Sequence, residues 1–294
     1  MINEKDLKLL KDINNTINRE VVKDPDFEIS DIIDDIAAIH NLSRPEAIDY
    51  VGRLMVAIMA FTGESVDTVR NPFKFDPDKS SELYLMTSLN NEEFLKNFYL
   101  GAYRSEVDMM LGRKMRNFSQ KDYSESNYIF SKFSKTKSTD DDVVDVSILY
   151  RGIFDLSFNA LNAWVRPGSV FDLGNIVSTT IDPSTAKFYA IKDTKPIAVF
   201  LKILNPNKVG FYVRGLSSFP NEEEVTLSGK VRTLSVEGNI TVKNKSGSLS
   251  VTKTKDYTKI LKFQKALLEK KAISKNDFEI VYITCELIWL AQKN

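Results

Sequence analysis

The spacing of apolar residues divides the chain into two parts. Up to about residue 140, apolar residues recur close to every 3.6 positions, as they do at Leu7, Leu10, Ile13 and Ile17. This period predicts amphipathic helices. After Asp142 the chain changes to short runs rich in β-branched and aromatic residues, which predict strands. We therefore expect a helical N-terminal region followed by a β-rich body.

The helical region contains several separate predicted helices. The apolar pattern of the first helix recurs over residues 29–39, and an apolar run at 51–61 follows Ser43-Arg44-Pro45-Glu46, which is typical of a helix start. Residues 71–82 contain Pro72 and Pro77 and predict a linker. Further helices are expected from about residue 91 and over 123–133, with a polar loop over 134–142.

The β-rich part is punctuated by turn residues and by few helical patterns. Strands are predicted over 143–150, 171–180, 197–204, 209–213, 224–231, 239–251 and 278–288, and helices over 156–165, 183–191 and 255–271. Strands follow strands without regular helical crossovers, which argues against a doubly wound α/β fold. No GxGxxG follows a strand, which argues against a Rossmann cofactor site. The predicted class is α+β, with an N-terminal helical layer and a mostly antiparallel β body.

Length and composition set the expected class of protein. With 294 residues the chain is long for one compact domain, and its 43% hydrophobic and 27% charged residues are typical of globular proteins. We divide it into a helical region of unknown function, residues 1–82, and a second domain, residues 83–294. No apolar stretch is long enough to span a membrane, and the charged start MINEKDLKLLKDINN lacks a signal-type core, so we expect a cytoplasmic protein that does not enter a membrane.

The chain has one cysteine, Cys285, and one histidine, His40. A single cysteine excludes an intramolecular disulfide, and we expect Cys285 to be a buried structural thiol. The scarcity of both residue types argues against a zinc site and against Ser-His-Asp or Cys-His catalysis, so no metal is expected. His40 is expected at a helix end.

Charge is unevenly distributed along the chain. Residues 230–275 carry eleven lysines and Arg232 against three acidic residues, an excess of nine positive charges, although the whole chain has a net charge of zero. Such a segment suits an anionic partner, nucleic acid included. The simpler interpretation, which we favour, is a solvated face on a lysine-rich helix with its flanking hairpins.

Two short motifs in the β part carry candidate chemistry. Arg151 follows an apolar run and precedes Gly152, an arrangement that suits a charge-assisted contact with a pyrophosphate close to the backbone. The alternative is a surface arginine beside a turn glycine. Ser178-Thr179-Thr180 can fix a neighbouring backbone through hydroxyl hydrogen bonds. It also fits an ordinary strand end followed by a helix N-cap at Asp182.

A third motif is the acidic run Glu222-Glu223-Glu224, which follows a turn and precedes an apolar run. If these residues lie on a strand, Glu222 and Glu224 share one face and Glu223 points away. Paired carboxylates beside a cleft can stabilise a developing positive charge. The alternative is an acidic turn in water.

Together, in this order, the three motifs resemble the R-S-E class of mono-ADP-ribosyltransferases. The similarity extends from about residue 91 to the C-terminus and is strongest over 149–227, where the third block reads Ser218-Phe219-Pro220-Asn221-Glu222-Glu223-Glu224-Val225. Residues 234–272 do not match the family pattern. The resemblance implies two packed, mostly antiparallel sheets that hold NAD+ as the substrate, and a chain of bacterial toxin or bacteriophage type that modifies its host.

The resemblance also implies roles for individual residues. Arg151 would bind the phosphates of NAD+, and the Gly152 backbone would bind the nicotinamide amide. Ser178, with Thr179, would position the ribose and the catalytic Glu224, while Glu222 would orient or deprotonate the acceptor and Phe219 would recognise it. An aromatic residue, Phe188 or Tyr189, and a basic residue, Lys192, would lie near NAD+ in the loop after the Ser-Thr-Thr helix.

The expected reaction is transfer of ADP-ribose to a macromolecule with release of nicotinamide. Glu-x-Glu in this family usually accompanies arginine acceptors, so a protein arginine is the first expectation, and RNA or DNA bound by residues 230–275 is the second. An NAD glycohydrolase and a catalytically silent binding module are further alternatives. The N-terminal region could bind a partner or an antitoxin.

Overall fold

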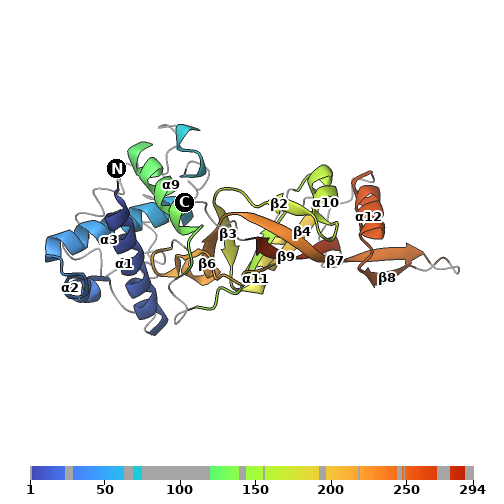
Figure 1. The fold of residues 1–294 in the computed structure, drawn as a ribbon. Coiled ribbons are helices and arrows are strands. Elements are labelled where there is room, and N and C mark those ends of the chain that lie inside the picture. The colour runs from blue at the N-terminus through green and yellow to red at the C-terminus, as the bar shows by residue number, and fades with distance from the viewer. Residues whose placement is uncertain are drawn as a thin grey trace, which may run out of the picture. The chain divides into compact units, whose positions relative to one another are not determined.

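The computed structural model describes residues 2–23, 29–62, 69–74, 120–138, 144–154, 156–191, 197–217, 219–243, 247, 249–269 and 279–288 (Figure 1). The chain divides into two compact units. The first comprises Met1–Val144 together with Phe211–Glu224, and the second comprises Asp145–Gly210 and Val225–Asn294. The predicted domain boundary at residue 82 lies outside the described residues and stays a prediction.

The first unit is mainly helical, as predicted. Its described helices are α1 (Glu4–Lys23), α2 (Ile29–His40), α3 (Arg44–Thr62), the short 3-10 helix η1 (Pro72–Lys74) and α9 (Gln120–Phe133). The apolar residues of α1 that set its period, among them Leu10, Ile13 and Ile17, are fully buried. The linker predicted over 71–82 is described only as far as η1, and the helix predicted from residue 91 lies outside the described residues.

A segment from the middle of the sequence completes the core of this first unit. Phe211 of β5 (Phe211–Tyr212) packs against two aromatic rings of α9, with ring centroids 5.4 Å from Phe130 and 4.7 Å from Phe133. Phe130 in turn stacks on Phe61 of α3 at 4.1 Å. After β5 the segment forms the 3-10 helices η3 (Arg214–Leu216) and η4 (Pro220–Glu222). The start of the chain that leads to the acidic motif is therefore part of the aromatic core of the first unit.

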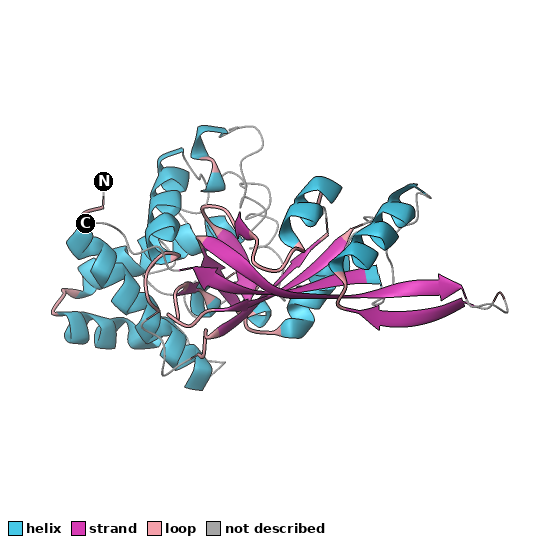
Figure 2. Cartoon of the chain, turned by 45° about the vertical axis from the view of Figure 1, so that its right-hand side comes forward, coloured by secondary structure: helices cyan, strands magenta, loops and turns pink. Residues whose placement is uncertain are grey.

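The second unit is built around a twisted sheet (Figure 2). In order across the sheet, its strands are β2 (Val170–Asp172), β7 (Lys230–Lys243), β9 (Ile280–Ile288), β4 (Ala198–Leu204), β1 (Ile148–Ile153), β3 (Val177–Thr180) and β6 (Glu224–Leu227), and β8 (Leu249–Thr254) pairs with β7. β4 and β9 run parallel, whereas β1 is antiparallel to both β3 and β4, and β7 is antiparallel to β2, β8 and β9. These strands, together with the helices of the first unit, confirm the predicted α+β class.

The predicted pair of sheets differs in one respect from the observed arrangement. The described strands belong to one hydrogen-bonded order, in which β1 and β3 are joined through the pair Tyr150 and Thr180. The strands β2, β7, β9, β4 and β1 lie on one side of this junction, and β3 and β6 follow on the other. The short β1–β3 pairing therefore joins these strands in one sheet, where the resemblance implies two packed sheets.

Helices cover both faces of this sheet. A Cβ on Gly152 would lie 2.0 Å from the Ala186 carbonyl oxygen of α11 (Pro183–Ile191), and a Cβ on Gly238 would lie 3.2 Å from Ile260 of α12 (Tyr257–Glu269). Gly152 of β1 pairs with Phe200 of β4. Gly238 of β7 pairs with Val281 of β9, and Val281 pairs with Val199 of β4, the residue before Phe200. Because adjacent strand residues point to opposite faces, α11 and α12 lie on opposite sides of the sheet (Figures 1 and 2). The helix α10 (Phe158–Trp164) contacts α12 and β2.

The strand predictions miss two features of the second unit. The run predicted over 171–180 is two strands, because the chain turns between them at Gly174, whose φ is 115°. Residues 230–243 form one long strand, β7, where the sequence suggests two runs, 224–231 and 239–251. A bulge between Thr233 and Ser235 interrupts the alternation that a sequence pattern detects. Beyond its pairing with β9, β7 continues with β8 as a projecting hairpin (Figure 2).

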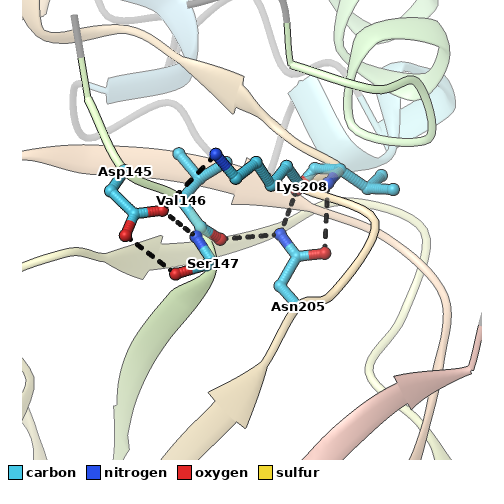
Figure 3. A network of polar contacts seen from close by, with 6 residues as sticks. Asp145, Val146, Ser147, Asn205 and Lys208 are labelled. Atoms are coloured by element: carbon cyan, nitrogen blue, oxygen red, sulfur yellow. Dashed lines mark hydrogen bonds and ion pairs between the residues drawn. The ribbon is translucent and has the colours of Figure 1, made fainter. Parts of the chain in front are cut away.

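A buried asparagine fixes the turn that follows β4 (Figure 3). The Asn205 amide donates to the carbonyl oxygens of Val146, at 2.9 Å, and Val209, at 2.7 Å, and its Oδ1 accepts from the Val209 N–H at 3.1 Å. Asp145 beside it accepts from the N–H and hydroxyl of Ser147, which lowers the pKa of its carboxyl group. The turn is thereby tied to the chain that enters β1.

Candidate active site

Arg151 lies in the middle of β1, paired with Leu201 of β4. Its side chain is half-buried, and the guanidinium donates to the backbone carbonyl of Ser178 on β3. Since Gly152 faces α11, strand alternation directs Arg151 to the face opposite that helix. The structure therefore gives Arg151 a fixed position on the sheet, and does not place it in the surface turn that was the alternative.

The Ser-Thr-Thr motif forms the end of β3 and bonds to both neighbouring strands. The Ser178 carbonyl receives the Arg151 guanidinium, and the buried Thr179 hydroxyl donates to the Val225 carbonyl of β6 at 2.6 Å. Val225 directly follows Glu224 in the chain. These two bonds connect the strands that carry the first and third motifs through the second.

The same motif also starts a helix, as the alternative interpretation predicts. The Thr180 hydroxyl accepts from the Asp182 N–H at 2.9 Å. The Asp182 carboxylate accepts from the N–H groups of Ser184 and Thr185, each at 2.9 Å, and these bonds lower the pKa of its carboxyl group. Asp182 is thus the N-cap of α11, which confirms the strand-end interpretation, and the role of the motif in a site stays a prediction.

Gly152 is required by packing against α11. Besides its contact with Ala186, a Cβ at this position would lie 2.4 Å from the Ala190 nitrogen and 2.8 Å from the Tyr189 carbonyl carbon. No side chain fits against backbone at such distances. The sequence suggests that the glycine allows a ligand to approach, whereas the structure supplies a separate reason in the close approach of a helix.

The acidic motif does not have the geometry expected from strand alternation. Glu222 ends the 3-10 helix η4, Glu223 has a positive φ of 49°, and only Glu224 belongs to a strand, as the first residue of β6. The argument that Glu222 and Glu224 share a strand face is therefore wrong, because Glu222 is not on the strand. Glu224 is buried, with 7% of its surface exposed, and its carbonyl accepts from the Val213 N–H at 3.1 Å.

The middle glutamate is held by two side chains that the sequence analysis missed. Glu223 forms an ion pair with the Arg214 guanidinium at 2.7 Å and accepts from the Tyr212 hydroxyl. Burial and the neighbouring carboxylate raise the pKa of Tyr212. The available sequence signal was the pair Tyr212 and Arg214, two residues apart just before the turn. The sequence pattern did not link this pair to Glu223.

The aromatic candidates lie on two different elements. Phe188 and Tyr189 belong to α11 itself, not to the loop after it, and their rings meet edge to face with centroids 5.6 Å apart. Phe188 is 58% exposed and Tyr189 is half-buried. Lys192 lies outside the described residues. Phe219, in the turn before η4, is 41% exposed.

The remaining single residues behave as structural groups. Cys285 is buried in β9, and burial raises the pKa of its thiol to about 12. His40 is the last residue of α2, as predicted. Within the described ranges, no group of three or more His, Cys, Asp or Glu residues could hold a metal ion. No helix in the same ranges has the length and apolar character needed to cross a membrane.

No family model matches the chain, and no curated protein matches it. Among solved structures it is similar to the Vis toxin, an ADP-ribosyltransferase from Vibrio splendidus, with 15% identity, 94% of this chain and 93% of that chain covered, and a TM-score of 0.37. The catalytic domain of VahC from Aeromonas hydrophila shares 14% identity over 81% of this chain and 97% of its own, with a TM-score of 0.35. Plx2a, an ADP-ribosyltransferase toxin from Paenibacillus larvae, shares 15% identity over 71% and 92%, with a TM-score of 0.30.

All three TM-scores are below 0.5, so the functional proposal has to rest on the residues of this chain. In structure, the chain is similar to bacterial ADP-ribosyltransferase toxins.

Proposed function

We propose that the chain transfers ADP-ribose from NAD+ to a protein arginine and releases nicotinamide. One observation carries this proposal. Arg151 of β1, the Ser-Thr-Thr motif of β3 and Glu224, the first residue of β6, belong to strands that are consecutive neighbours in the sheet, and the Ser178 carbonyl and Thr179 hydroxyl bond to β1 and β6 respectively. An arginine, a hydroxyl-bearing strand end and a buried glutamate therefore belong to adjacent strands.

In this proposal, Arg151 binds the phosphates of NAD+. A guanidinium presents a planar set of N–H donors that matches phosphate oxygens, and its contact with the Ser178 carbonyl holds it in place before NAD+ arrives. Ser178 and Thr179 position the ribose and the start of β6, and the Gly152 backbone binds the nicotinamide amide. Phe188 or Tyr189 on α11, with Lys192 after it, would contact the dinucleotide.

Glu224 would act on the bond that breaks. As nicotinamide leaves, positive charge develops on the ribose ring, and a carboxylate that hydrogen-bonds the 2′-hydroxyl stabilises this oxocarbenium-like state, as in glycoside hydrolysis. Burial strengthens such an electrostatic interaction because little water screens it. Glu222, which precedes it on η4, would orient or deprotonate the acceptor, and the exposed ring of Phe219 would contact the acceptor.

The test compares the wild-type protein with Glu224→Gln, using labelled NAD+ and bacterial lysate, with agmatine as a small guanidine acceptor in parallel. We expect Glu224→Gln to lower nicotinamide release by about 10²–10³-fold, because it removes one preorganised charge contact. Glu237→Gln on β7 is the matched control and should retain wild-type activity. Glu222→Gln should lose transfer to agmatine while retaining much of the nicotinamide release.

The fate of the label separates the candidate reactions. Label that depends on Glu224 and survives nuclease supports transfer to protein. Nicotinamide release without retained label would indicate an NAD glycohydrolase, and neither release nor label would contradict the enzymatic proposal.

Transfer to nucleic acid is the second candidate, favoured by the exposed lysines of β8, of α12 and of the link between them. Lys253, Lys255, Lys259, Lys262 and Lys265 are all exposed, and two of them form ion pairs, Lys253 with Glu237 at 2.6 Å and Lys259 with Asp256 at 3.9 Å. Removal of the label by nuclease would favour this acceptor over a protein.

A further inference from the structure

The first helix holds the backbone of the segment that leads to the acidic motif. The side-chain amide groups of Asn14 and Asn18 on α1 both donate to the Tyr212 carbonyl, at 2.9 and 3.0 Å. Asn18 also accepts from the Gly215 N–H at 2.9 Å. Asn18 therefore bridges the end of β5 and the following helix η3.

These contacts are buried and tightly packed. Asn14 is fully buried, and Asn18 and Tyr212 are each 1% exposed. A Cβ on Gly215 would lie 2.8 Å from the Asn18 Oδ1 and 3.0 Å from the Ile17 side chain, so a larger residue at position 215 would press on the Asn18 amide. Buried amides at such sites strongly favour one arrangement, because a lost partner leaves a polar group without water.

From Tyr212 the contacts continue to the glutamates. The Tyr212 hydroxyl and the Arg214 guanidinium hold Glu223, and the Val213 N–H donates to the Glu224 carbonyl. Both neighbours of Glu223 are the proposed reacting carboxylates. Asn18 thus connects to the Glu224 backbone through Tyr212 and Val213, and to Glu223, the neighbour of Glu222, through the Tyr212 side chain.

We propose that Asn14 and Asn18 are positioning residues, which set the location of Glu222 and Glu224 through the Tyr212–Gly215 backbone. This inference rests on the proposed function of the two glutamates. It assigns the N-terminal helix a part in the reaction, whereas the sequence suggests a partner- or antitoxin-binding surface or additional core. A shift of about 1 Å in a reacting group can lower a rate about 100-fold, so a displaced segment affects turnover strongly.

The test uses two variants that break the same contact from opposite sides. Asn18→Leu removes both hydrogen bonds of the amide, and Gly215→Ala places a methyl group against its oxygen. Leu10→Ala is the control, because it removes buried apolar surface from the same helix and leaves these hydrogen bonds in place. We expect the kcat for nicotinamide release to fall about 10- to 100-fold in both variants, with a KM for NAD+ within about threefold of wild type, since Arg151 belongs to the second unit.

A second measurement reports on position directly. Amide hydrogen exchange over residues 211–224 should be faster in Asn18→Leu and Gly215→Ala than in Leu10→Ala at equal distance below each melting temperature. A kcat within twofold of wild type in a folded Asn18→Leu protein, or unchanged exchange over 211–224, would overturn the inference. If Asn18→Leu does not fold, Gly215→Ala decides the question by the same criteria.

Failure of the proposed function has a different signature. In that case the wild-type protein releases no nicotinamide from NAD+, while the exchange measurement still shows whether α1 holds the segment.

Discussion

At the scale of single residues, Gly152 has a structural role that its motif does not reveal. From its place beside Arg151, the sequence suggests either the close approach of a ligand or an ordinary turn glycine. Its position under α11 shows that a side chain of any size would collide with the helix backbone. Gly152 can have both roles, but only the packing role predicts that a substitution destabilises the fold.

Gly152→Ala should destabilise the fold by about 3 kcal/mol or more, because overpacking against backbone cannot be relieved by a rotamer change. Gly168→Ala is the control: its φ of 85° costs about 1–2 kcal/mol, but nothing lies within 4 Å of its Cβ. Urea unfolding of both variants measures the difference. A destabilisation of Gly152→Ala no larger than that of Gly168→Ala would contradict the packing role, and weaker NAD+ binding with unchanged stability would favour a role in ligand binding only.

At the scale of elements, α11 depends on the N-cap that ends the Ser-Thr-Thr motif. Asp182→Ala should destabilise the protein by about 1 kcal/mol at pH 7, the usual contribution of an N-cap side chain. The pKa of Asp182 is lowered in the folded state, so this stabilisation is present above the unfolded pKa of about 3.9 and is lost as pH falls through the folded pKa.

Unfolding in urea at pH 7 and at about pH 3 tests this dependence. The gap between wild type and Asp182→Ala should shrink at the lower pH. Asp182→Asn keeps a capping side chain that does not titrate, and its stability relative to Asp182→Ala should stay nearly constant. A gap that is the same at both pH values would show that the carboxylate does not cap the helix in its charged form.

Elements with local signals were predictable from the sequence. The helix at 183–191 has a proline in its first turn and an aspartate before it, and the structure places α11 over Pro183–Ile191. β4 likewise follows its apolar run. The bulged β7 was not predictable, because Leu234 is 42% exposed and interrupts the alternation at Thr233 and Ser235.

Long-range contacts account for most of what the sequence left unassigned in the candidate site. Asn14 and Asn18 lie on the buried side of α1 with Ile13 and Ile17, and polar residues four apart on an apolar stripe were the available signal. No feature of the neighbouring sequence indicates that their hydrogen-bond partner, Tyr212, lies nearly 200 residues away along the chain. The 3-10 helix that ends at Glu222 was also not predicted, because an acidic run followed by an apolar run is typical of the start of a strand.

At the scale of the whole molecule, the charge separation predicts binding of an anionic polymer. Residues 230–275 carry an excess of nine positive charges in a chain of zero net charge. We expect weak binding of single-stranded RNA. The logarithm of its binding constant should fall linearly with the logarithm of the salt concentration, with a slope of about −0.7 for each phosphate contact. Replacing Lys259, Lys262 and Lys265 of α12 by Gln should reduce the magnitude of this slope by about 2.

Filter binding of a labelled RNA between low and physiological salt measures the slope. Replacing Lys5 and Lys8 of α1 by Gln is the control, because it removes positive charge from outside residues 230–275. Absence of RNA binding by the wild-type protein at low salt would mean that the lysines of α12 form only a solvated surface. Transfer of ADP-ribose to agmatine should be unchanged in all of these lysine variants.

The membership of Phe211–Glu224 in the N-terminal unit has a consequence for synthesis of the chain. Translation delivers α1, α2, α3 and α9 well before this segment leaves the ribosome. Until then Asn14 and Asn18 lack the Tyr212 carbonyl, and the rings of Phe130 and Phe133 lack their contact with Phe211. The nascent N-terminal unit is completed only when Glu224 has emerged. A truncated product that stops before residue 211 therefore lacks the proposed catalytic glutamate and part of the core of its first unit.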